Sequence, residues 1–480
     1  MRLDRSLLLA IAGWFLGSVL GWAQAAAPLV LAGGTVIDVS NWGRSASDLH
    51  DAVVIIQNGK VAEVGPASTL QVPKGARVID CTGKYILPGL VDGYVGMTDQ
   101  SQASASLYMG VTTAVVRSDS RRGHVDQSVT PAPHLYLIDS VGATDDWSLL
   151  IGHESWGARL RQYGRASELP PDETLKQLAA TKALGTRVVY IGPHVTAANT
   201  QSLIARAHQM GIIAYGEFVA TPFRVGIEAG VDALVHMGSY ELGAIPDELQ
   251  QPLAADPEGA PATTAFDYAE RVPPSDLRVR SYAKFIASHH AALMPTFAMY
   301  FSRLPDHRNL WEEPAAALLD PSHLSNAPDR KTGEINYPLP SWAKHLPGIG
   351  QRYVEANLEK KADQSALRLW HINQALFAAF PHYLAASGAP VDGSFPGISL
   401  QVELELLVRM GLTPREALAA ATNNYALEFN WNELGAVAAG RRADVLVLDA
   451  DPTANIWNAR KISTLILEGN VMDREGLLKK

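Results

Sequence analysis

Leu87–Met97, with the sequence LPGLVDGYVGM, is the stretch that most strongly indicates the fold. A short apolar run ends here on polar and glycine residues, as a buried parallel strand does where its tip reaches a functional face. We therefore expect Ile86–Val91 to be a strand, with Asp92 and Tyr94 at its functional end.

Strands and helices alternate through the middle of the chain. The further expected strands are Thr112–Val116, His134–Ile138, Arg187–Ile191, Ile212–Tyr215, Ala233–His236, Ala292–Thr296 and Tyr383–Ala386. The expected helices are Thr174–Leu184, Asn199–Met210, Leu277–His290 and Leu358–Phe380. Eight strands with helices between them predict an α/β fold built on a (β/α)8 TIM-like barrel over residues 86–432.

Both ends of the chain have the pattern of short β-strands. We expect residues 26–85 and 433–480 to form one composite β-sandwich domain, with Asn58–Gly59 as a hairpin turn. Two proline-rich insertions, near residues 239–275 and 300–350, follow the sixth and seventh barrel strands. Long loops at that face are typical of lids or substrate-recognition elements, and flexible surface insertions are the alternative.

The first 25 residues have the pattern of a secretory signal peptide. Arg2 and Arg5 precede an apolar run, and Ala23–Ala25 forms a small-residue cleavage site. This predicts a periplasmic or secreted protein with no membrane attachment after cleavage near Ala25; an uncleaved anchor is the alternative. The net charge of −9 without a basic patch argues against nucleic acid as a partner. Cys81 is the single cysteine, which excludes an internal disulfide.

Seven motifs in fixed order carry a resemblance to a known family. They are GGTVID (33–38), NGKVAEVG (58–65), VIDCTGKYILPGLVDG (78–93), GVTTAV (110–115), GVDALVHM (230–237), GLTPREALAAATNNYA (411–426) and LGAVAAGRRADVLVLDADP (434–452). In this order they resemble the amidohydrolase superfamily, especially its exported, imidazolonepropionase- and prolidase-like branch. The resemblance implies a barrel with a β-sandwich, and hydrolysis of carbon–nitrogen (non-peptide or dipeptide) bonds by water activated on divalent metals.

The resemblance also implies a ligand set that this chain largely lacks. The family pattern has an HxH after the first strand, a Lys or Glu on the fourth, a His on the fifth and sixth, and an Asp on the eighth. The residues at these places are, in order, Tyr94 and Gly96, Tyr190, Glu217, His236 and Gly388. Only His236 is retained, and a carboxylate replaces one histidine.

We therefore expect no cofactor, with a single zinc ion as the alternative. A catalytic zinc needs three protein ligands. His236 and Glu217 supply two, and a third would come from His194, His153 or Asp392. The catalytic candidates are Glu217, His236 and Asp392. The expected ligand pocket contains Asp92, Tyr94, Tyr190, Glu217 and His236.

Two functions from different classes remain open, so the residues do not decide whether the protein is an enzyme. The first is a metal-poor, catalytically degenerate member, a pseudoenzyme. It would bind a small-molecule ligand, or form a complex with a catalytic paralogue as the non-catalytic subunit, or form a homo-oligomer. The alternative is an active hydrolase with a rearranged mononuclear metal site at His236, Glu217 and a loop His or Asp.

Overall fold

The computed structural model describes residues 27–117, 125, 131–144, 148–152, 154–164, 167–257, 259–269, 271–304, 306–335, 367–368, 370–378, 382–391 and 393–479. The predicted signal peptide, His153, Asp392 and about half of the predicted helix Leu358–Phe380 lie outside these ranges. Within that helix, residues 367–368 and 370–377 are described and are helical, as predicted. No helix within them has the length and apolar composition needed to cross a membrane.

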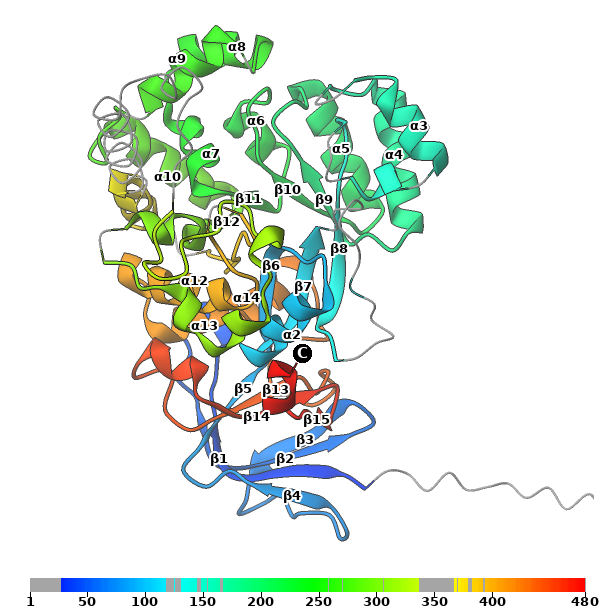
Figure 1. Ribbon diagram of the computed structural model, residues 1–480, viewed down its shortest axis with the longest axis vertical. Helices are drawn as coiled ribbons and strands as arrows, with labels where there is room; N and C mark the ends of the chain where they lie inside the picture. Colours follow the sequence, from blue (N-terminus) through cyan, green and yellow to red (C-terminus); the bar gives the residue numbers. More distant parts are fainter. Residues whose placement is uncertain are drawn as a thin grey trace, which may run out of the picture.

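One sheet combines strands from both ends of the chain (Figure 1). Its strand order is β15-β14-β13-β5-β1-β2-β3, and β4 pairs with β1. The strands are β1 (Leu29–Val36), β2 (Leu49–Gln57), β3 (Lys60–Pro66), β4 (Arg77–Asp80), β5 (Tyr85–Pro88), β13 (Val445–Leu448), β14 (Ile462–Leu467) and β15 (Asn470–Val471). The predicted hairpin turn is confirmed, because Asn58 and Gly59 both have positive φ between the antiparallel strands β2 and β3.

The second sheet is parallel and contains seven strands in the order β12-β11-β10-β9-β8-β7-β6. They are β6 (Leu90–Gly96), β7 (Val111–Arg117), β8 (His134–Ser140), β9 (Val188–Ile191), β10 (Ile213–Gly216), β11 (Ala233–Val235) and β12 (Ala292–Met294). Every one of these strands overlaps a predicted one. Side chains from all seven strands fill a common interior, so this part of the fold is a packed core.

Most of the labelled α-helices lie around the parallel sheet, and α8 and α9 lie beyond it at the top of the view (Figure 1). The α-helices of the described residues are α1 (Ser40–Gly43), α2 (Gln100–Tyr108), α3 (Glu154–Arg161), α4 (Pro171–Ala183), α5 (Ala197–Gln209), α6 (Phe223–Glu228), α7 (Met237–Tyr240), α8 (Asp247–Ala255), α9 (Ala260–Ala269), α10 (Leu277–His289), α12 (Ile398–Met410), α13 (Pro414–Ala420) and α14 (Asn423–Phe429). Short 3-10 helices are η1 (Leu149–Gly152), η2 (Glu241–Ala244), η3 (Phe297–Arg303), η4 (Leu310–Glu312), η5 (Pro314–Leu318), η6 (Pro321–His323), η8 (Ile456–Arg460) and η9 (Glu475–Leu478). The predicted helices at 174–184, 199–210 and 277–290 correspond to α4, α5 and α10.

The predicted eighth strand, Tyr383–Ala386, is not a regular strand. Tyr383 forms only an isolated parallel bridge with Leu293 of β12. On the other side, the backbone N–H of Gly93 in β6 donates to Ala385 O at 3.3 Å. The N–H of Ala385 itself donates to Ala420 O, outside the sheet. The segment thus lies between β12 and β6, but its hydrogen bonds are divided between the sheet and a helix.

The prediction that Ile86–Val91 forms one strand is wrong, because two strands share these residues. Gly89 divides it into β5, which belongs to the first sheet, and β6, which belongs to the parallel sheet. A Cβ atom at Gly89 would lie 2.1 Å from Thr112 Oγ1, so the chain can change sheets here only at a glycine. The Gly89 N–H donates to Asp444 O at 2.9 Å.

Candidate functional site

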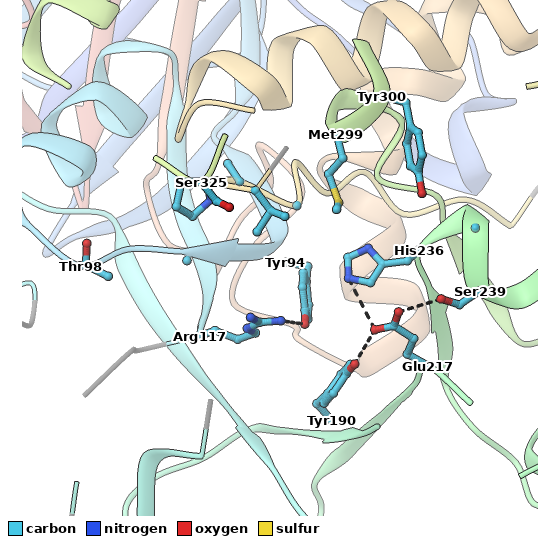
Figure 2. A pocket seen from close by; sticks show the side chains of 16 residues that line it. Tyr94, Thr98, Arg117, Tyr190, Glu217, His236, Ser239, Met299, Tyr300 and Ser325 are labelled. Carbon is cyan, nitrogen blue, oxygen red and sulfur yellow. Dashed lines mark hydrogen bonds and ion pairs between the residues drawn. The ribbon is translucent and has the colours of Figure 1, made fainter. Parts of the chain in front are cut away.

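A cavity of about 650 Å³ opens where the C-terminal ends of the parallel strands meet (Figure 2). Parallel strands present their C-terminal ends at one edge of the sheet, which is where ligands bind in such folds. The lining residues are Tyr94, Gly96, Thr98, Arg117, Tyr190, Glu217, His236, Gly238, Ser239, Met299, Tyr300, Ser325, Gly388, Ala389, Pro390 and Val391.

Glu217 follows the last residue of β10, and its side chain is held by two hydroxyl donors. The Tyr190 hydroxyl donates to one carboxylate oxygen, and the Ser239 hydroxyl donates to the other at 2.7 Å (Figure 2). The backbone N–H of Glu217 donates to Ile191 O at 3.0 Å, which fixes the residue against β9. The carboxylate is therefore oriented by neighbours on two elements.

His236 follows β11 and points its ring at the same carboxylate. Its Nε2 lies 3.8 Å from Glu217 Oε2, and its Nδ1 lies 2.8 Å from Thr296 Oγ1. Thr296 Oγ1 also lies 2.6 Å from Pro295 O, so its single proton can go to that carbonyl or to His236 Nδ1. Nδ1 is thus the ring nitrogen held by Thr296, and Nε2 is the nitrogen that faces Glu217.

Two tyrosines complete the polar wall. The Arg117 guanidinium donates to the Tyr94 hydroxyl and lies 5.0 Å from the centre of the Tyr94 ring. The Tyr94 ring meets the His236 ring edge-on, with centroids 5.0 Å apart. Burial, and then the nearby charge of Glu217, hold the pKa of Tyr190 well above its usual value. Tyr190 is therefore a neutral hydrogen-bond donor.

The structure brings together four of the five residues expected in the pocket, namely Tyr94, Tyr190, Glu217 and His236. Asp92 does not line the cavity. It is buried behind it, where its Oδ1 accepts from the backbone N–H of Ser387 at 2.9 Å. Burial raises the pKa of Asp92 to about 6.

Of the three residues predicted as a third metal ligand, His194 does not line the cavity. His153 and Asp392 lie outside the described part of the chain. Gly388, at the position of the family's aspartate, does line the cavity but offers no side-chain ligand.

Sequence reasoning missed several cavity residues. Arg117 is the last residue of β7, so the strand-end rule that pointed to Asp92 and Tyr94 would also have found it. Ser239 lies one helical turn beyond His236. Met299, Tyr300 and Ser325 come from the long segment after β12, and no local motif marks them.

The cavity residues that the structure describes do not by themselves fit a catalytic zinc ion. A catalytic zinc takes three protein ligands from His, Cys, Asp or Glu. Across the described ranges, no group of three or more such side chains is arranged to hold a metal. Glu217 and His236 are instead hydrogen-bonded to Tyr190, Ser239 and Thr296.

Comparisons with known proteins agree with the motifs. Residues 387–472 match the model of the Amidohydrolase family. Imidazolonepropionase of Geobacillus sp. is 33% identical over 465 residues, which covers 90% of this chain and 92% of that protein. Imidazolonepropionase of Deinococcus deserti is 35% identical over 135 residues, but this match covers only 34% of that protein and 24% of this chain.

Solved structures share the fold at low sequence identity. A putative prolidase from Bifidobacterium longum has a TM-score of 0.58 and 18% identity, with 95% of this chain and 98% of that chain covered. Molinate hydrolase has a TM-score of 0.59 and 17% identity, with 94% and 96% covered. The fold is therefore of the TIM-like barrel type. A relative that is one-third identical over nine tenths of both chains confirms the family, and this chain belongs to the amidohydrolase superfamily.

Proposed function

We propose that this protein binds a small polar molecule in its cavity and does not carry out the metal-dependent hydrolysis of its family. The observation that carries the proposal is the state of Glu217, whose two oxygens accept hydrogen bonds from Tyr190 and Ser239. By resemblance, Tyr190 stands where the family has a metal-bridging lysine. In this chain the Tyr190 hydroxyl at that position donates a hydrogen bond to the Glu217 carboxylate.

The cavity suits a ligand with groups of both polarities. Its volume of about 650 Å³ falls within the range of small-molecule sites. Arg117 supplies a positive charge at one wall, and Glu217 supplies a negative charge at another. Tyr94, Ser325 and Thr98 add hydroxyl groups. A molecule that carries both a hydrogen-bond donor and an anionic or carbonyl group would match these walls.

We also infer the finer architecture on which this cavity depends. In this account Tyr383–Ala386 completes an eight-stranded barrel, because it contacts β12 on one side and β6 on the other. The two chain ends form the composite domain, and cleavage near Ala25 exports the protein.

The test is ligand binding measured without reference to turnover. We would screen untagged protein by thermal shift against lactams, N-acyl amino acids and dipeptides, and measure hits by calorimetry. We expect at least one hit whose affinity falls at least tenfold in Glu217→Gln and stays unchanged in Glu405→Gln. Glu405 is a suitable control because it pairs with Arg308 and Arg460 and does not line the cavity. Equal loss in both variants would contradict the proposal.

A hydrolase built on His236 and Glu217 is the second candidate. The observation that favours it is the orientation of His236, since a histidine whose Nδ1 is held by a partner presents Nε2 for proton transfer. This candidate predicts that His236→Ala and Glu217→Ala both abolish turnover of a lactam or dipeptide, assayed with and without added Zn²⁺. Full activity in either variant would rule it out.

A further inference from the structure

Thr296 holds His236 from a strained backbone position. It lies two residues after β12, is fully buried, and has φ 53° and ψ 44°. This left-handed conformation is unfavourable for a β-branched residue. Such a conformation persists only where the surrounding structure enforces it. The contact between Thr296 Oγ1 and His236 Nδ1 therefore depends on whatever fixes residues 296–298.

A buried carboxyl group lies against that segment. Glu403 is in the middle of α12, and none of its surface is exposed. Its Oε2 accepts a hydrogen bond from the backbone N–H of Ala298 at 2.8 Å, and the N–H groups of Phe297 and Thr296 also interact with this carboxyl. These amides begin η3, where the first N–H groups of a helical turn have no partner within the helix.

We propose that Glu403 is a positioning residue for His236. By holding the amides of residues 296–298, it keeps Thr296 in the conformation that hydrogen-bonds His236 Nδ1, and so directs Nε2 of His236 toward Glu217 and the cavity. This inference rests on the proposed function, because the orientation of His236 serves the binding of a ligand in the cavity. The orientation itself is a property of the ligand-free protein and is tested there.

The surroundings of Glu403 decide which substitution preserves this role. Burial raises the pKa of Glu403 to about 8, and the ionisable groups that interact with it are Asp92, Tyr240 and Tyr425. A largely uncharged carboxyl at neutral pH is well imitated by glutamine, whose amide oxygen can accept from Ala298. Leucine has a similar volume but offers no acceptor, so it isolates the hydrogen bond.

The test is the tautomer of His236 in ligand-free protein, measured by long-range ¹H–¹⁵N NMR of histidine-labelled samples. The His236 signals would be assigned with His236→Gln. We expect the same His236 tautomer in the wild type, in Glu403→Gln and in the control Glu405→Gln. In Glu403→Leu we expect at least a third of the molecules to carry the proton on the other ring nitrogen. An unchanged tautomer in folded Glu403→Leu would overturn the proposal, as would the same change in Glu405→Gln.

A pH series tests the same point without the leucine variant, should that protein fail to fold. Ionisation of Glu403 above pH 8 strengthens its hold on the three amides. The His236 nitrogen shifts should therefore show an inflection near pH 8 in the wild type that Glu403→Gln lacks. An inflection of equal size in both proteins would overturn the proposal. Since neither readout needs a ligand, failure here is distinct from failure of the proposed function.

Discussion

Removing the Tyr190 hydroxyl should destabilise the protein, because that group donates to the Glu217 carboxylate. Tyr190 is 7% exposed, so phenylalanine would fill the same space and only the hydrogen bond would be lost. A hydrogen bond to a charged group contributes about 1.5–3 kcal/mol. The Glu217 side chain is 19% exposed and keeps its bond to Ser239, so water can partly replace the donor. We expect Tyr190→Phe to lower the free energy of unfolding by about 1.5 kcal/mol.

Tyr215→Phe is the matched control for this measurement. Tyr215 lies on the neighbouring strand β10 and is fully buried, and its hydroxyl has no hydrogen-bond partner among the described residues. Removing a buried hydroxyl that has no partner should be neutral or stabilising.

Urea denaturation of both variants, alone and combined with Glu217→Ala, gives the coupling energy directly. We expect a coupling of about 1.5 kcal/mol for Tyr190 with Glu217 and about zero for Tyr215 with Glu217. Equal coupling for the two tyrosines would refute the account of how Glu217 is held.

Two further predictions concern other parts of the fold. Burial, followed by His290 and Arg44, lowers the pKa of His382 to about 4, and its ring stacks on Trp42 with centroids 3.8 Å apart. In the unfolded chain the His382 ring becomes protonated near pH 6.5, whereas in the folded protein it does so near pH 4. The stability that His382 contributes therefore falls by about 1.4 kcal/mol per pH unit as the pH drops from 6.5 to 4. In urea denaturation, His382→Phe should lose less stability than the wild type between pH 7 and pH 5. An equal loss in the two proteins would contradict the assignment. Gly93→Ala should cost about 1–3 kcal/mol, because its Cβ would lie 1.7 Å from the Tyr425 hydroxyl that donates to Ala385 O. Gly65→Ala is the control, since its Cβ would meet Leu70 at an ordinary 3.5 Å, and similar losses in thermal unfolding would count against this packing.

The parallel strands could be predicted from the sequence because each is a short apolar run that ends on polar residues. That rule placed Tyr94 at the functional edge, and the family resemblance placed Tyr190, Glu217 and His236 there; all four line the cavity. The rule did not predict the break between β5 and β6 at Gly89, because the residues on both sides of that glycine are apolar. The break there depends on the close approach of Thr112, a contact between residues distant in sequence.

The remaining parts of the site depend on tertiary contacts that no local pattern encodes. Met299, Tyr300 and Ser325 reach the cavity from a long segment without a motif. Glu403 looks in sequence like one more charge on a surface helix, and only its burial against residues 296–298 distinguishes it from Glu405. Tyr383–Ala386 has the composition of a strand, but its hydrogen bonds are shared with Ala420.

The central claim is that the cavity of this amidohydrolase-superfamily protein binds a ligand without a catalytic metal. Its most direct test is elemental analysis of untagged protein, purified without chelator, incubated with Zn²⁺ and then desalted. The account predicts far less than one divalent metal ion per chain and no metal-dependent hydrolysis of lactams or dipeptides. One or two tightly bound ions per chain, together with hydrolysis that a chelator abolishes, would contradict it.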